Sequence, residues 1–144
     1  MVPQSKTASA RSLGDLNIGV SLFDTAHAEL ASFIDRFCED YRTSPSGAYV
    51  ESRFEMLQQK ISRHFLHEEE YMRHSGYPQS AAHSKDHARM TNLLKKLFAT
   101  TDFTNRAEQS VPPAIRQFFD ETLPTHIVDH DRAFGAYLNS KGIR

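Results

Sequence analysis

The chain has 144 residues, with 17 basic and 18 acidic side chains, eight histidines and one cysteine, which suits a single domain with a real core. The balanced charge excludes a basic surface for nucleic acid or an anionic membrane, and no apolar stretch is long enough to span a bilayer. Because Cys38 is alone and the N-terminus lacks the apolar core of a secretory signal, we expect a cytoplasmic protein without disulfides.

The N-terminal region divides into a polar arm and an apolar segment. Residues 1–14 offer little to bury, so we predict a flexible arm there and a helical bundle domain over residues 15–140. The apolar segment contains Leu13, Leu16, Ile18 and Val20. Gly14 and Gly19 interrupt it, and because glycine is costly inside a helix, this predicts an extended segment packed across the domain.

The first two predicted helices each place a histidine within an apolar stripe. The first spans about residues 21–41, and its buried row is Phe23, His27, Leu30, Ile34, Phe37 and Tyr41. The second spans about residues 48–74, and its row is Val50, Phe54, Leu57, Ile61, His64, Glu68 and Met72. His64 and Glu68 lie one turn apart, and burying an ionised carboxylate costs several kcal/mol unless another group compensates it.

The third and fourth predicted helices repeat this pattern. The third spans about residues 79–98, after a stop at Gly76 and Pro78, and its row is His83, His87, Met90, Leu94 and Leu97. The fourth spans about residues 110–139, with Ser110 as N-cap and a proline in the first turn. Its row is Ile115, Phe119, Leu123, His126, Ile127, Phe134 and Leu138.

A partner for His126 is not fixed by spacing. Asp129, His130 and Asp131 follow it at offsets of three, four and five residues. Simple helical geometry favours Asp129 or His130, whereas the apolar row of the helix favours Asp131.

Four helices joined by short turns predict an all-α, antiparallel up-down-up-down four-helix bundle. One histidine on an apolar face is normally a hydrogen-bonded core residue. Five histidines on the inward faces of four helices, with two pairs at i,i+4 spacing, instead indicate a metal site on the bundle axis.

The sequence resembles the hemerythrin family, in particular its stand-alone bacterial members, over about residues 13–138. The matching elements are Gly19-Val20, Asp24-Thr25-Ala26-His27, His64-Phe65, Glu68-Glu69, Met72, Gly76-Tyr77-Pro78, His83, His87, His126-Ile127 and Asp131. The resemblance implies reversible dioxygen binding at a non-haem di-iron centre with an oxo or hydroxo bridge, for storage, transport or sensing.

The same resemblance implies a role for each site residue. One iron would be held by His83, His87 and His126, and the other, which keeps an open position for dioxygen, by His27 and His64. Glu68 and Asp131 would bridge both irons, so the family pattern selects Asp131 over Asp129 and His130. The residues at the family's oxygen-pocket positions are Leu30, Phe65, Met90 and Leu123.

Two other functions compete with oxygen binding. A di-iron oxidase or peroxidase is disfavoured because the chain lacks the Glu-x-x-His pairs of ferritin-like enzymes. A regulatory protein responsive to iron or redox state would need a separate partner, because no output domain follows the bundle. We therefore expect a non-enzyme that binds dioxygen, with an unidentified protein as recipient of oxygen or signal, and no nucleic-acid or membrane partner.

The chain also departs from the bacterial pattern. Thr122 stands where a Trp is common, which predicts easier water entry and faster autoxidation than in Trp-bearing relatives. Pro124 lacks an N–H group and should bend the helix near His126. The other candidates have simpler explanations: Glu69 is solvated or bonds a ligand imidazole, Asp24 favours the helix dipole, Cys38 fills core space, and His67, His74 and His130 face solvent or an outer layer.

Overall fold

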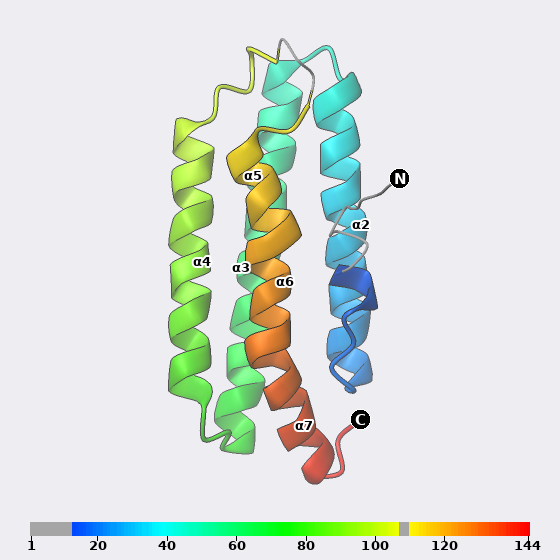
Figure 1. The fold of residues 1–144 in the computed structure, drawn as a ribbon, viewed down its shortest axis with the longest axis vertical. Coiled ribbons are helices and arrows are strands. Elements are labelled where there is room, and N and C mark those ends of the chain that lie inside the picture. The colour runs from blue at the N-terminus through cyan, green and yellow to red at the C-terminus, as the bar shows by residue number, and fades with distance from the viewer. Residues whose placement is uncertain (1–12, 107–109) are drawn as a thin grey trace, which may run out of the picture.

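The computed structural model describes residues 13–106 and 110–144, and every regular element within them is helical. The helices form four rods, the last of them made of several consecutive helical segments. The rods pack side by side, each antiparallel to the next along the chain (Figure 1). The first three are α2 (Ser21–Thr43), α3 (Gly47–Ser75) and α4 (Ser80–Thr100). The predicted all-α bundle is therefore confirmed for the described residues, while residues 1–12 of the predicted arm lie outside them. None of the described helices is long and apolar enough to cross a membrane.

The fourth rod is a succession of helical segments. They are α5 (Pro113–Gln117), η1 (Phe118–Thr122), α6 (Leu123–His126), η2 (Ile127–Asp131) and α7 (Arg132–Ser140). The predicted N-cap at Ser110 is wrong, because Pro112 occupies the N-cap and Pro113 begins the helix. A proline at the first helical position loses no hydrogen bond and has its φ angle already set, so it marks the start more strongly than the serine does.

Two wide turns, η1 and η2, are π-helical. In η1 the Leu123 N–H donates to the Phe118 carbonyl, five residues back, immediately before Pro124. Because proline cannot donate a hydrogen bond, a π-turn beside it lets the chain continue as a helix. The distortion expected at Pro124 therefore takes the form of a widened turn before it. In η2 the Arg132 N–H donates to the Ile127 carbonyl across the same spacing.

The sequence-predicted turns position the first three rods. Ser46 caps α3, its Oγ accepting the Tyr49 N–H at 3.1 Å, and Gly76 ends α3 with a φ of 69°. That left-handed φ is readily adopted by glycine, which lets the chain reverse towards α4. These turns place the apolar faces of α2, α3 and α4 against the fourth rod.

The segment before α2 forms a strap over residues 13–20. It is helical at residues 13–15 and has no regular secondary structure afterwards, with a bend at Gly19, so the expectation that it is not a helix holds only from Leu16 onwards. Leu13 is fully buried in the core, two residues before the predicted start of the domain. The strap is tied down by the Ile18 N–H, which donates to Asp24 Oδ1 at 2.7 Å, and by Asn139 Nδ2, which donates to the Gly19 carbonyl at 2.9 Å.

Candidate metal centre

All seven residues predicted as metal ligands converge inside the bundle, and all are buried. They form two overlapping groups, in each of which the potential ligand atoms lie within 4.8 Å of one another. The first group is Glu68, His83, His87, His126 and Asp131, and the second is His27, His64, Glu68 and Asp131. Only the two carboxylates belong to both groups. The structure thus brings the seven together, while their role as iron ligands stays a prediction.

The carboxylate of Glu68 faces a different pair of imidazoles with each oxygen. Oε1 lies 2.8 Å from Nε2 of His83 and 3.2 Å from Nε2 of His87. Oε2 lies 3.3 Å from Nε2 of His64 and 4.0 Å from Nε2 of His27. One oxygen is therefore turned towards each group, the arrangement needed to join two metal positions.

Asp131 is divided in the same way. Its Oδ1 lies 2.9 Å from Nε2 of His83 and 3.0 Å from Nε2 of His126, and its Oδ2 lies 3.2 Å from Nε2 of His27. The π-turn explains why Asp131 faces inward, because the hydrogen bonds of a π-helix join residues five apart. His126 precedes this turn and Asp131 ends it. Among the three partners left open by spacing, Asp131 is the one in the buried groups, while Asp129 is exposed.

The inward atoms of this cluster are fully buried and lie close to one another, but none of them has a hydrogen bond of good geometry. They are Nε2 of His27, His83, His87 and His126, both oxygens of Glu68, and Oδ1 of Asp131. Buried polar groups in folded proteins are nearly always hydrogen-bonded, and buried charges are paired or bind metal. Imidazole and carboxylate donors together suit a first-row divalent metal such as iron, so the residues present fit a buried metal site.

The charges within the cluster are strongly coupled. Burial and the nearby Asp131 charge raise the pKa of Glu68, but the imidazoles of His64, His83 and His87 outweigh them and lower it to about 2. Burial also raises the pKa of Asp131, but His126, His27 and His83 bring it well below the ordinary value. Both carboxylates are therefore ionised at neutral pH, which provides negative charge for a cation.

The pKa values of three imidazoles shift in the opposite direction, upwards. Burial lowers the pKa of His83, but the carboxylates of Asp131 and Glu68 raise it to about 9. Burial likewise lowers the pKa of His27 and of His126, and the carboxylates again give a net increase. Protons and metal ions thus compete for the same nitrogen atoms.

Two acidic side chains bind the cluster from outside. His87 Nδ1 donates to Glu69 Oε2 at 2.6 Å, and His126 Nδ1 donates to Asp86 Oδ2 at 2.7 Å. Such bonds fix the tautomer and direct the lone pair of Nε2 into the cluster. Of the two explanations for Glu69, bonding to an imidazole is correct. Asp86 was not identified from the sequence, because its spacing to Arg89, which it binds at 2.8 Å, is that of an ordinary surface ion pair.

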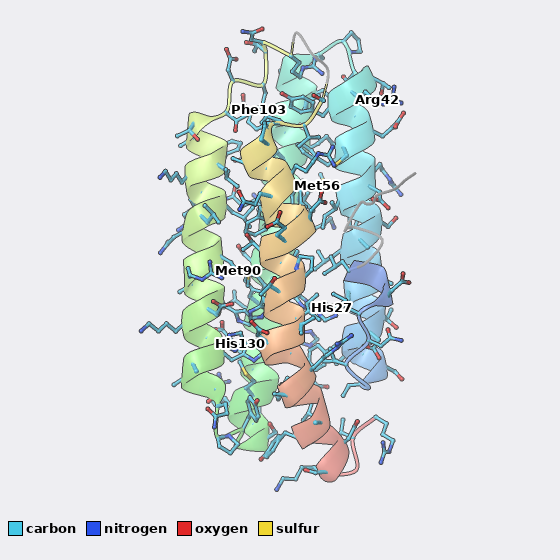
Figure 2. All side chains as sticks on the ribbon, in the orientation of Figure 1. His27, Arg42, Met56, Met90, Phe103 and His130 are labelled. Carbon is cyan, nitrogen blue, oxygen red and sulfur yellow. The ribbon has the colours of Figure 1, made fainter. Side chains whose placement is uncertain are left out.

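The remaining sequence candidates lie outside the cluster. His67 and His74 are exposed, and His130 is half-buried, with its ring 5.2 Å from that of His126. Figure 2 shows His27 on α2 and His130 on the fourth rod. Cys38 is half-buried and packs against the core, as expected for a residue that fills space.

A small cavity, too narrow to hold a water molecule, adjoins the cluster. Three of the predicted oxygen-pocket residues, Leu30, Phe65 and Leu123, line it, and the Phe65 ring is stacked on His87 at 4.1 Å. Met90 is fully buried but does not line this cavity, and neither does Thr122. Leu13 and Ile127 also line it and were not predicted. Leu13 was expected to pack across the domain, but it was not assigned to the cavity because spacing along the chain does not fix where that segment lies.

Comparison with known proteins agrees with this geometry. Residues 18–138 match the family described as Hemerythrin HHE cation binding domain. The chain is similar to a bacteriohemerythrin of Stenotrophomonas maltophilia (strain R551-3), at 28% identity over 129 residues, which cover 87% of this chain and 81% of that protein. No solved structure was found to match the chain.

Proposed function

The chain belongs to the hemerythrin family, and we propose that it binds dioxygen reversibly at a non-haem di-iron centre. Its role would be oxygen storage, transport or sensing. One observation carries the proposal. Glu68 and Asp131 each direct one carboxylate oxygen to the first histidine group and the other oxygen to the second, as a pair of metal ions would require. Two ferrous ions bound there supply redox-active metal at which dioxygen can bind and leave again.

The residues that would hold the irons follow from the two groups. His83, His87 and His126 would hold one ion, His27 and His64 the other, with both carboxylates shared. The two ionised carboxylates offset part of the charge of two buried cations, while five neutral imidazoles complete the donor set. This histidine-rich set favours oxygen binding over the carboxylate-rich chemistry of ferritin-like oxidases.

The apolar wall makes release of unchanged dioxygen feasible. Leu30, Phe65 and Leu123 present only hydrocarbon to the cavity beside the cluster, and all three are buried. A wall of this kind excludes water and supplies no proton to reduced oxygen. His87 and His126 use Nδ1 to bind outer carboxylates, so their N–H groups are directed away from the cavity.

Iron content and the visible spectrum test the proposal. The protein is reduced and loaded without air, its iron per chain is measured, and spectra are taken before air, after air and after removal of oxygen. Two irons per chain and an oxygen-dependent band that disappears under vacuum are expected. Asp131→Asn should lose the band, whereas the exposed neighbour Asp129→Asn serves as the matched control and should retain it.

Two other results would contradict reversible oxygen binding. Two irons that oxidise at once, with no oxygenated form that persists, would favour a di-iron oxidase, a peroxidase or a redox sensor. Fewer than about one iron per chain would leave a family fold without the proposed centre.

A further inference from the structure

The histidines of the two groups differ in how their outer nitrogen atoms are held. His87 and His126 each donate Nδ1–H to a carboxylate, at 2.6 and 2.7 Å. Nδ1 of His27 and of His83 is buried and has no hydrogen-bond partner. His64 faces Glu68 Oε2 with Nε2, at 3.3 Å, and none of the described residues forms a hydrogen bond with its outer nitrogen, Nδ1. An outer carboxylate therefore holds two of the three rings in the first group, and no described residue holds either ring of the second group in this way.

The two outer carboxylates also connect the elements that carry the first group. Glu69 on α3 binds His87 on α4, and Asp86 on α4 binds His126 on the fourth rod. Asp86 is itself held by Arg89 at 2.8 Å. Three of the four rods are thereby joined around His83, His87 and His126. Helix α2 contributes His27 without any comparable bond.

In the second group His64 also lies nearer to solvent, whereas His27 is 2% exposed, like His87 and His126. A surface groove of about 760 Å³ runs between α2 and α3, and His64 lines both this groove and the small inner cavity. His64 is 8% exposed, compared with 1% for His83 and 2% for His87 and His126. A metal ion at the second group would thus be bound by His64, whose ring is less firmly held and is more accessible to water and competing ligands.

We propose that the two metal positions are unequal: the position of His83, His87 and His126 fills first and tightly, and the position of His27 and His64 fills last and is emptied first. Glu69 and Asp86 act as positioning residues for the tight position. A carboxylate on the outer nitrogen orients a metal-binding imidazole and raises its basicity, and losing such a partner weakens metal binding about 10–100-fold. This inference depends on the two-metal centre of the proposed function.

Anaerobic titration of the metal-free protein with Fe(II), in competition with a coloured chelator, tests the inequality. Two steps are expected, with the first at least about 10-fold tighter than the second. Glu69→Ala and Asp86→Ala should each weaken the first step about 10–100-fold. Glu70→Ala and Asp129→Ala change exposed acids on the same helices as Glu69 and His126, and should leave both steps unchanged.

Conservative variants separate positioning from folding. Glu69→Gln and Asp86→Asn keep a hydrogen-bond acceptor but lose the charge, so they should restore part of the first-step affinity. His64→Ala should remove the second step and leave the first. Thermal unfolding of each metal-free variant, followed by circular dichroism, shows that the bundle is intact before iron is added.

Three outcomes would overturn the inference: a single step for both irons, no weakening in Glu69→Ala and Asp86→Ala, or loss of both steps in His64→Ala. The oxygen spectra separate this failure from that of the proposed function. One-step binding with a reversible oxygen band would refute only the inequality. Stepwise binding without such a band would refute only reversible oxygenation, and absence of iron binding would refute both.

Discussion

The bundle contains two kinds of core built on the same helices. Near the connection between α4 and α5, aromatic rings pack around Phe54, whose ring centre lies 5.3 Å from Phe37, 6.0 Å from Phe98 and 5.6 Å from Phe103. Figure 2 labels Phe103 at that end and His27 lower in the bundle. We call the first region the aromatic layer and the seven-residue cluster the metal layer.

The two layers differ in what they need in order to be stable. Every large side chain of the aromatic layer is satisfied by contact with hydrocarbon, so burial alone stabilises it. The metal layer buries carboxylate and imidazole atoms without hydrogen-bond partners, and this costs free energy unless a cation compensates it. The aromatic layer can therefore sustain the fold while the metal layer retains a binding function that folding does not require.

Removing the centre of the aromatic layer should have the largest effect on folding. Phe54 is fully buried, so Phe54→Ala should lower the free energy of unfolding by about 3–5 kcal/mol through lost burial and a new cavity. Urea denaturation of the metal-free protein measures this change. Met56→Ala, two residues away and 42% exposed, is the control and should change stability by less than about 0.5 kcal/mol.

Removing the metal should change only the stability that the metal layer contributes. Free Fe(II) at about a thousand times its dissociation constant should stabilise the chain by about 4 kcal/mol, because the unfolded chain has no assembled site. Anaerobic unfolding with Fe(II) and with excess chelator gives the difference. The loss in Phe54→Ala should be equal in both conditions, because Phe54 packs on Phe37, Phe98 and Phe103 and, among the described residues, on no ring of the metal layer. A metal effect that vanishes in Phe54→Ala would show that the two layers are not independent.

How much of this organisation could be predicted differs between the layers. The apolar stripes predicted all four rods, and a polar residue at a stripe position is conspicuous; this identified His27, His64, Glu68, His83, His87 and His126. The bundle is confirmed, and the structure brings these six together. Periodicity works here because α2, α3 and α4 are regular helices.

Other features depend on contacts that no periodicity records. Asp131 faces inward because of the π-turn η2, and spacing rules for an α-helix favour its neighbours instead. Asp86 accepts a hydrogen bond from His126 on another rod, although its sequence context is that of a surface ion pair. Leu13 reaches the cavity only because the strap folds back over α2 and α7. In each case the deciding contact joins segments whose relative placement is a tertiary property.

Displacing the strap should have an intermediate effect on the free energy of unfolding and would show how firmly the strap is held. A Cβ atom at Gly135 would clash with the Ile18 carbonyl oxygen, so Gly135→Ala must push the strap away. The expected loss is about 1–3 kcal/mol, with weaker protection of the Ile18 amide from hydrogen exchange. At Gly14 a Cβ would meet only Ala31, at an ordinary 3.6 Å, so Gly14→Ala should preserve that protection. Equal protection of Ile18 in both variants would contradict this account of the strap.

The smallest expected effect concerns Cys38, whose thiol reactivity measures how well water is excluded from the core around it. Burial, together with Asp35 and Asp120, outweighs Arg116 and raises the pKa of its thiol from 9.0 to about 11. At pH 8 the thiolate fraction should thus be about 100-fold lower in the folded chain than in urea, and reaction with a disulfide reagent correspondingly slower. Because the unfolded chain loses this proton first, stability should fall between pH 9 and 11, and Cys38→Ser should remove that contribution. Adding Fe(II) should leave the folded rate unchanged, and a rate that follows iron content would contradict the separation of the two layers.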